Sequence, residues 1–226
     1  MVLKNEPDRD FFQKRIYGGT DISVYVVSSE TWISSFDAFW FDEFIYILNG
    51  SAEVIAHDKT YALENLSYVF APKGFPGQWQ VNAGNNYHYE LSVITNARAD
   101  TTVTSIESIQ SLLISSVNIN FDENGLYETP LAKGIELDIL LKAEIPRVFE
   151  IQDNDVIQMI QILSDQITLR SSTETSQTFS QETFLYYPKN ILEHGKVRVM
   201  ATQSYFAFRN LKNYKFLFVL LTVLGN

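Results

Sequence analysis

The sequence predicts an all-β protein built from two similar domains in tandem, and two observations carry that prediction. First, the 226-residue chain contains one pattern twice, since a stretch that begins at Gly19 returns at Gly134, about 115 positions later. Second, apolar residues tend to alternate with polar ones in short segments, with the period of two that is typical of β-strands. A repeat of this length indicates a duplicated domain of ordinary size.

Strand signals run through the whole first copy. Segments rich in Val, Ile, Tyr and Phe stand at 21–27, 43–48, 67–72 and 87–94. Turn residues separate them, at Asn49-Gly50, 57–59, 64–65 and 83–86. Asn-Gly between two apolar runs is a strong hairpin signal, because both residues tolerate positive φ. Short strands at near-regular spacing predict a sandwich or a barrel.

The second copy repeats this order with weaker signals. Its segments stand at 134–147, 156–169 and 184–197. Leu163-Ser164-Asp165 takes the place of the Asn-Gly turn, with side chains that can still hydrogen-bond their own backbone. We expect the Ser/Thr-rich stretch 171–183 to be a surface turn of this domain.

These patterns also predict the domain boundaries. We expect a first domain over 1–97, a linker over 98–120, a second domain over 121–211 and an apolar tail over 212–226. In the linker, the helical spacing of Ile106, Ile109, Leu112 and Leu113 indicates a short helix or an irregular strand. The apolar run 216–224 is less than half the roughly 20 residues that a membrane-spanning helix needs. We therefore expect a terminal strand or helix that docks on the core or at a dimer interface, rather than a membrane anchor.

Composition excludes several classes of function. The formal net charge is −10, and no cluster of Lys and Arg offers the phosphate neutralisation that nucleic-acid binding requires. The chain contains no cysteine, which removes disulfides, thiolate chemistry and sulfur-ligated metals. Its charged N-terminal segment lacks the apolar core of a secretory signal, so we expect a cytoplasmic protein.

Two motifs of the first copy resemble a known family. Glu43 stands seven residues before Gly50, and Pro72, Gly74 and Phe75-Pro76 follow in the second motif. Both spacings resemble the motifs of the cupin superfamily. The motif sequences DEFIYILNG and PKGFPGQW are similar to those of the branch that includes ethanolamine-utilisation proteins and two-barrel ureidoglycine aminohydrolases. The resemblance implies two tandem double-stranded β-helix (jelly-roll) barrels joined by a short linker.

The resemblance also implies a metal site, from which this chain departs. Family members hold a divalent metal (Mn, Fe, Ni or Zn) with two histidines, the glutamate and the histidine of the second motif. Phe36, Asp37, Ala38 and Phe39 occupy the segment of the paired histidines, and Gly77 occupies the position of the third. Glu43 alone keeps a ligand residue, with Asp37 as a possible neighbour. We therefore predict no cofactor, and a metal held by Glu43 and Asp37 is the weaker alternative.

The second copy offers a different and ambiguous set of polar residues. Gln158 aligns with Glu43, Asn190 with the motif glycine, and Glu193 with the third histidine, beside His194. Alternation along a strand would send Glu193 and His194 to opposite faces. We expect them at a barrel mouth or on its surface. His57 is expected to be solvated in a turn, and His88 to be packed or hydrogen-bonded in a strand.

The first copy is where we expect any ligand pocket. Glu43 is the expected buried carboxylate, and a general-base role is open to it if apolar surroundings raise its pKa. Rings near it in sequence include Trp32. The remaining pocket candidates are Gln78, Trp79, Phe75, Trp40 and Tyr46. Two interpretations stay open. The rings could serve purely as the core of a jelly roll, or a carboxylate among them could bind a small cationic or hydroxylated ligand.

Three kinds of function stay open at this stage. A non-catalytic bicupin that binds a small molecule, or serves as a structural dimer, agrees with the missing metal ligands. An interaction module would use the apolar tail and unpaired sheet edges, with a homodimer as one outcome. A metal-dependent enzyme of the ureidoglycine aminohydrolase type agrees with the duplication and with Glu43. We place them in that order, so we expect no enzymatic activity, no nucleic-acid partner and no membrane partner.

Overall fold

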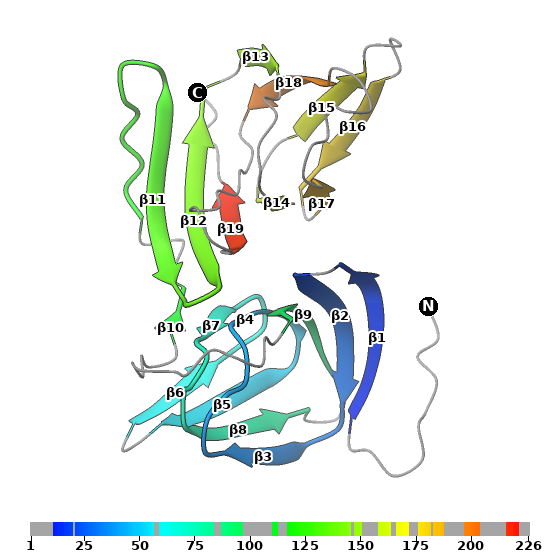
Figure 1. Cartoon of the computed structure of the whole chain (residues 1–226), viewed down its shortest axis with the longest axis vertical. Helices are drawn as coiled ribbons and strands as arrows, with labels where there is room; N and C mark the ends of the chain where they lie inside the picture. The colour runs from blue at the N-terminus through cyan, green and yellow to red at the C-terminus, as the bar shows by residue number, and fades with distance from the viewer. Residues whose placement is uncertain are drawn as a thin grey trace. The chain divides into compact units, whose positions relative to one another are not determined.

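The computed structural model contains only β-strands as regular structure in the residues it describes. These are residues 11–19, 21–56, 59–83, 87–96, 110–112, 117–145, 147–150, 158–163, 166–171, 176–181, 183–187, 197–203 and 216–221. No helix occurs among them, and hence none that could cross a membrane (Figure 1). The all-β prediction is confirmed for this part of the chain.

The chain divides into two compact units, which are described separately. Unit 1 comprises Met1–Leu113 together with the short turn Gly134–Glu136. Unit 2 comprises Ile114–Lys133 and Leu137–Asn226.

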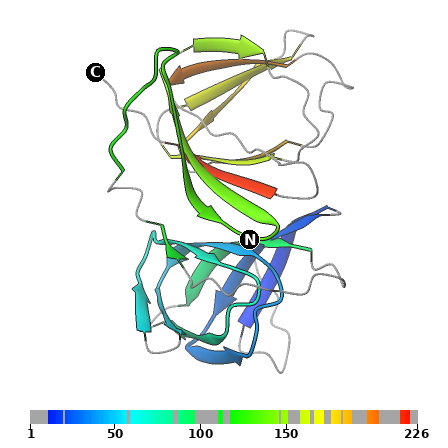
Figure 2. The same ribbon diagram turned by 60° about the vertical axis from the view of Figure 1, so that its left-hand side comes forward.

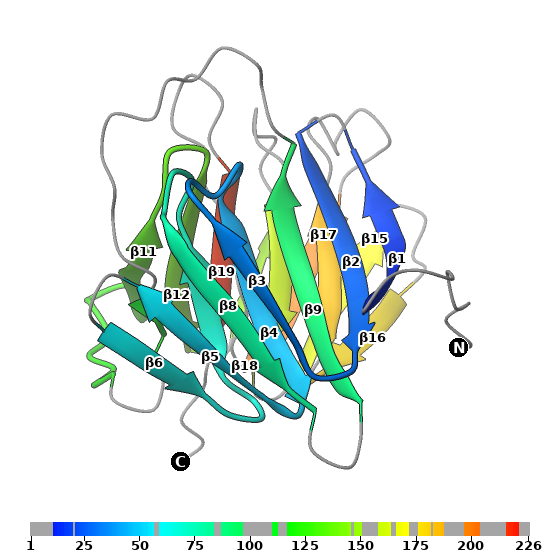
Figure 3. The same cartoon turned by 90° about the horizontal axis from the view of Figure 1, so that it is seen from below.

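Unit 1 contains two antiparallel sheets. Its strands are β1 (Phe11–Gly18), β2 (Ile22–Ser29), β3 (Trp32–Phe36), β4 (Glu43–Asn49), β5 (Ser51–Ala56), β6 (Lys59–Leu63), β7 (Tyr68–Ala71), β8 (Gly77–Asn82), β9 (His88–Thr95) and β10 (Gln110–Ser111). The six-stranded sheet has the order β1-β2-β9-β4-β7-β10, and the four-stranded sheet has the order β3-β8-β5-β6. Figure 3 shows β9, β2 and β1 following one another across the larger sheet.

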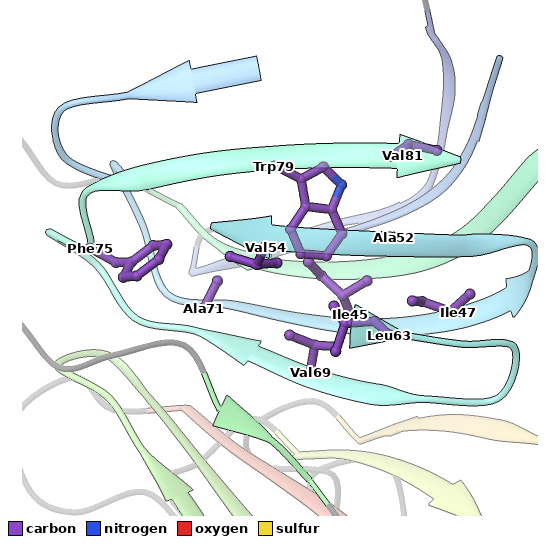
Figure 4. Packing of buried hydrophobic residues seen from close by; sticks show 10 residues of the cluster. All are labelled: Ile45, Ile47, Ala52, Val54, Leu63, Val69, Ala71, Phe75, Trp79 and Val81. Atoms are coloured by element: carbon purple, nitrogen blue, oxygen red, sulfur yellow. The ribbon is translucent and has the colours of Figure 1, made fainter. Parts of the chain in front are cut away.

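An apolar core lies between the two sheets of unit 1. Ile45 and Ile47 of β4 face it from the larger sheet, and Val54 and Trp79 face it from the smaller one. All of these side chains are buried, and Figure 4 shows Trp79 pointing from β8 toward Ile45. Removing such a side chain from water contributes about 1.5–3 kcal/mol to stability. The alternate residues of each strand therefore specify which face turns inward.

The Asn49-Gly50 turn differs from its prediction as a hairpin. β4 pairs with β7 and β9, whereas β5 pairs with β6 and β8, so the two strands that flank Gly50 belong to different sheets. Gly50 has φ +90, and a Cβ there would lie 3.2 Å from the Cα of His88. The glycine makes a tight corner that carries the chain from one sheet to the other. The Asn-Gly pair correctly predicts a turn, but the partners of the two flanking strands depend on long-range packing.

Unit 2 also contains two sheets. Its strands are β11 (Leu126–Lys133), β12 (Leu137–Glu144), β13 (Arg147–Glu150), β14 (Gln158–Ile162), β15 (Gln166–Ser171), β16 (Ser176–Ser180), β17 (Phe184–Tyr187), β18 (Val197–Gln203) and β19 (Phe216–Leu221). The sheet orders are β11-β12-β19-β14-β17 and β13-β18-β15-β16. Figure 2 shows β11 and β12 as a long hairpin, drawn in green.

Unit 2 combines antiparallel with parallel strand pairing. β19 lies between β12 and β14 and runs parallel to both. Its sequence FLFVLL is a continuous apolar run, which is typical of a strand buried on both faces rather than of an alternating strand. The apolar segment expected as a separate tail thus supplies an inner strand of the sheet.

Two other local expectations can be compared with the structure. Ser176–Ser180, inside the stretch expected to be a surface turn, forms β16 and pairs with β15, although most of its residues are exposed. Within the expected linker, Gln110–Ser111 pairs with β7 and so extends the larger sheet of unit 1. The linker residues Ile106, Ile109 and Leu113 and the turn residues Ser164 and Asp165 lie outside the described residues.

Gly50→Ala should lower the free energy of unfolding of unit 1 by about 1–3 kcal/mol, because an L-residue is strained at this positive φ. Urea denaturation followed by tryptophan fluorescence measures this, since all three tryptophans lie in unit 1. Gly18→Ala is the matched control, because a Cβ at Gly18 meets only the flexible end of Arg15 and the φ is not positive. Equal losses in both variants would contradict the corner's role.

Candidate functional site

A cavity of about 610 Å³ opens between the two sheets of unit 1. All three tryptophans of the chain, Trp32, Trp40 and Trp79, line it. Trp79 is buried, whereas Trp40 is 77% exposed. Trp40 therefore lies where the cavity meets solvent.

Strand alternation explains which residues reach the cavity. On β3, Trp32, Ser34 and Phe36 line it, two positions apart. On β9, Glu90, Ser92 and Ile94 do so with the same spacing. Because alternate side chains of a strand share one face, each of these strands presents one row to the cavity.

The loop between β3 and β4 adds more rings to the wall. The Phe39 amide donates to the carbonyl of Phe75 at 2.8 Å, and the Gly74 amide donates to the carbonyl of Phe39 at 2.6 Å. These bonds fasten the loop to the Pro72–Phe75 turn and bring the phenylalanine rings together. The ring centroids of Phe36 and Phe39 are 5.0 Å apart, and those of Phe36 and Phe75 are 6.0 Å apart. Such tilted pairs stabilise beyond the area that they bury.

The opposite wall carries two carboxylates. Glu43 lies on β4 and Glu90 on the adjacent β9, and both line the cavity. The hydroxyl of Ser92 donates a short hydrogen bond to Oε1 of Glu43. Nε2 of His88 lies 2.9 Å from Oε2 of Glu90, and the His88 side chain is fully buried. As expected from the sequence, His88 is packed and hydrogen-bonded.

Glu43 is strongly shifted toward its protonated form. Burial among the rings disfavours its charge, and the like charge of Glu90 adds to the effect, so the pKa of Glu43 rises from 4.5 to about 8. The hydrogen bond from Ser92 acts in the opposite direction. Part of Glu43 is accessible, but this part faces the ring-lined cavity rather than open solvent. At neutral pH Glu43 is therefore mainly a hydrogen-bond donor.

The residues around the cavity do not fit a metal ion. Position 77 cannot carry an imidazole, because even a Cβ there would lie 2.7 Å from the carbonyl oxygen of Ile55 and 2.9 Å from the ring of Phe75. Phe36 turns an apolar ring into the cavity, and Asp37 is exposed and does not line it. Among the described residues, no three His, Asp or Glu side chains gather closely enough to hold a metal. Apolar rings occupy the space that imidazoles would need.

The structure brings together four of the six residues that we named as pocket candidates. Glu43, Phe75, Trp79 and Trp40 line the same cavity, together with Trp32. Gln78 does not, because it has the opposite parity to Trp79 on β8, and its amide donates to the hydroxyl of Ser35 at 3.0 Å. Tyr46 has the opposite parity to Ile45 and stacks on Tyr68, with ring centroids 4.6 Å apart. Both face away from the cavity.

The candidates of the second copy can be placed only in part. Gln158 lies at the start of β14, where it pairs with Tyr187. Asn190, Glu193 and His194 lie outside the described residues, as does His57 of the first copy.

Sequence reasoning missed the residues that β9 contributes. Glu90 and Ser92 follow His88 at intervals of two, and this alternation of polar side chains inside a strongly β-forming segment was the available signal. Tyr25 of β2 was missed too, although Tyr25 pairs with Ser92 across the sheet. Strand order was needed to find them, because β9 reaches β4 only through long-range pairing.

Comparison with known proteins identifies one matching family model and several solved structures with a similar fold. A family model described as a EutQ-like cupin domain matches residues 34–89. The cupin 2 conserved barrel domain protein from Leptotrichia buccalis is similar, with a TM-score of 0.61 and 10% identity over 91% of this chain and 89% of that one. A putative glyoxylate induced protein from Pseudomonas aeruginosa has a TM-score of 0.63 and 10% identity, covering 94% of this chain and 86% of that one.

A third structure, the Ylba protein from E. coli, has a TM-score of 0.55 and 14% identity over 91% of this chain and 85% of that one. No curated protein matches the chain. At these identities the likeness to the solved structures shows the fold alone. Together with the spacing of Glu43, Gly50, Pro72 and Gly74, the family match shows that residues 34–89 belong to a cupin domain.

Proposed function

We propose that the protein binds a small organic molecule in the cavity of unit 1, without a metal ion. One observation carries the proposal: aromatic rings, among them Phe36, Phe39 and Phe75, line a cavity that stays open, at about 610 Å³, beside the buried carboxyl group of Glu43. A core selected for stability alone would close such a space, because each unfilled volume forfeits packing contacts. A largely apolar cavity with a few convergent polar groups is the usual form of a small-molecule site.

The buried carboxylates support the same proposal. Glu43 and Glu90 face the cavity although burying acidic groups near one another is unfavourable. On the same inner face of β4, Ile45 and Ile47 show that apolar residues are compatible with the fold. Retention of two acids beside an open space favours a binding role over a purely structural one.

The architecture that we propose is a bicupin, with a jelly-roll barrel in each unit. The solved cupin structures that match the chain extend over nine-tenths of its length, which supports a second barrel in unit 2. Cytoplasmic location and homodimerisation remain predictions, which fractionation and a measurement of mass in solution can test. A metal-dependent enzyme of the ureidoglycine aminohydrolase type is disfavoured by Gly77, where no imidazole fits.

A matched pair of variants tests the binding proposal. Ser34 lines the cavity from β3, whereas the neighbouring Ser35 is exposed on the outer face. Wild-type protein should show saturable changes in tryptophan fluorescence with at least one member of a panel of small amines, ureides and sugars. Ser34→Phe should strongly weaken or abolish the response, because its ring takes up part of the cavity, and Ser35→Phe should retain it. Equal responses in both variants would place the binding elsewhere, and no response to any compound would overturn the proposal.

The stability of unit 1 should fall as the pH rises from about 5 to about 8. The folded-state pKa of Glu43 lies above its unfolded value, so the stabilising proton is fully bound below pH 4.5 and is lost as the pH rises through about 8. The slope from this group is at most about 1.4 kcal/mol per pH unit. Glu43→Gln should remove that slope, as measured by urea denaturation at several pH values.

Glu53→Gln is the control for this titration, because Glu53 lies on β5 with the opposite parity to the core residue Val54 and does not line the cavity. It should keep the wild-type slope. Parallel stability curves for wild type and Glu43→Gln would show that Glu43 is not perturbed.

Removal of metal should leave the protein unchanged. Prolonged treatment with a chelator is expected to shift neither the unfolding temperature nor the tryptophan emission, since the cavity wall supplies no imidazole. Elemental analysis of the purified protein checks the same point. A stoichiometric transition metal that disappears in Glu43→Gln would contradict this prediction and favour the enzyme alternative.

A further inference from the structure

The ionisable side chains that line the cavity of unit 1 are all acidic. Among the described residues that line it, these are Glu43 and Glu90, and no Lys or Arg is present. Glu43 is mainly protonated in the empty cavity, and a cation beside it would favour its ionised form. A cavity with apolar walls concentrates the field of such groups, because little water screens them. The site therefore repels anions and favours a ligand that carries positive charge.

The rings add to this preference. The face of an aromatic ring is electron-rich, so it attracts a cation placed over it, and tryptophan does so most strongly. Trp32, Trp40 and Trp79 all line the cavity, and phenylalanine rings complete much of the remaining wall. An organic cation would contact ring faces with its carbon atoms while its charge is compensated by carboxylates.

A polyhydroxylated ligand fits the wall less well. Apart from the carboxylates, the side chains with a hydroxyl or amide group that line the cavity are Gln13, Tyr25, Ser34 and Ser92. Gln13 is exposed, and the hydroxyl of Ser92 already donates to Glu43. Several hydroxyls of a sugar would lose their water partners without replacement, which costs affinity.

From this arrangement we infer that the ligand of unit 1 is a small organic ammonium ion, held between the Glu43 and Glu90 carboxylates and the tryptophan-rich wall. A cation there would compensate the charge of both acids, which are brought together by the pairing of β4 with β9. This inference rests on the proposed function and adds the chemical class of the ligand.

Two pairs of compounds matched in shape test the inference on the wild-type protein. Choline is compared with its neutral isostere 3,3-dimethyl-1-butanol, and butylammonium with 1-butanol, by titration of tryptophan fluorescence and by calorimetry. Each cation should bind about ten-fold or more tightly than its neutral partner. Butyrate, which has the opposite charge, should not bind.

The variants assign the preference to the two acids. Glu90→Gln and Glu43→Gln should each reduce the ratio of cation to neutral affinity by about ten-fold, while Glu53→Gln should leave that ratio unchanged. Far-ultraviolet circular dichroism shows whether each variant is folded. If Glu90→Gln does not fold, the matched cation and neutral compounds on the wild-type protein test the inference.

The outcomes separate this inference from the proposed function. If the neutral isosteres or sugars bind as well as the cations, the inference is overturned while the binding proposal stands. Cation binding that survives Ser34→Phe would also overturn it, because the ligand would then lie outside the cavity. If no compound of any class binds, both proposals fall together.

Discussion

The packing of one side-chain row from each strand between the two sheets of unit 1 is the constraint on which its other features depend. Ile45, Ile47, Val54 and Val81 are buried there because each stands at an inward position of its strand. Reversing the parity of any one strand would move its whole row to the outside. The same alternation that builds the core therefore also decides which side chains reach the cavity at its open end.

The cavity lies where the side chains that face one another across the two sheets change from aliphatic to aromatic and acidic. Near β5 and β7 the inward rows meet and form a dense apolar core, as Figure 4 shows for Val54, Ile45 and Val69. Toward β9 the inward row includes the polar residues Glu90 and Ser92, and the opposing wall consists mainly of large rings. Rings and carboxylates do not interdigitate as aliphatic side chains do, so space remains between them.

Phe75 and Gly77 together explain how this site departs from its relatives' chemistry. The amide of Phe39 and the carbonyl of Phe75 hold the loop and the turn in one arrangement, which places the Phe75 ring over position 77. With the ring there, a side chain at 77 has no room. The ring of Phe75 therefore both forms part of the apolar cavity wall and excludes a side chain at position 77.

Much of the fold and part of the site could be predicted from the order and spacing of residue types along the chain. The period of two predicted strands, the repeat predicted two units, and the spacing from Glu43 to Gly50 and from Pro72 to Gly74 indicated the cupin superfamily. Of the residues named as pocket candidates, Phe75 and Trp79 line the cavity. Gln78 and Tyr46 have the opposite parity to the inward residues of their strands, so both face away from it.

The sequence by itself determined the class of structure and the inward rows, because these follow from residue type and from spacing within a single strand. Only the tertiary structure decided the partners: β9 beside β4, the corner at Gly50 in place of a hairpin, and β19 parallel between β12 and β14. It also decided that Glu43 meets Glu90 and Ser92, residues that lie almost fifty positions away along the chain. Pairing between strands depends on how whole apolar faces pack together, and no local pattern contains that information.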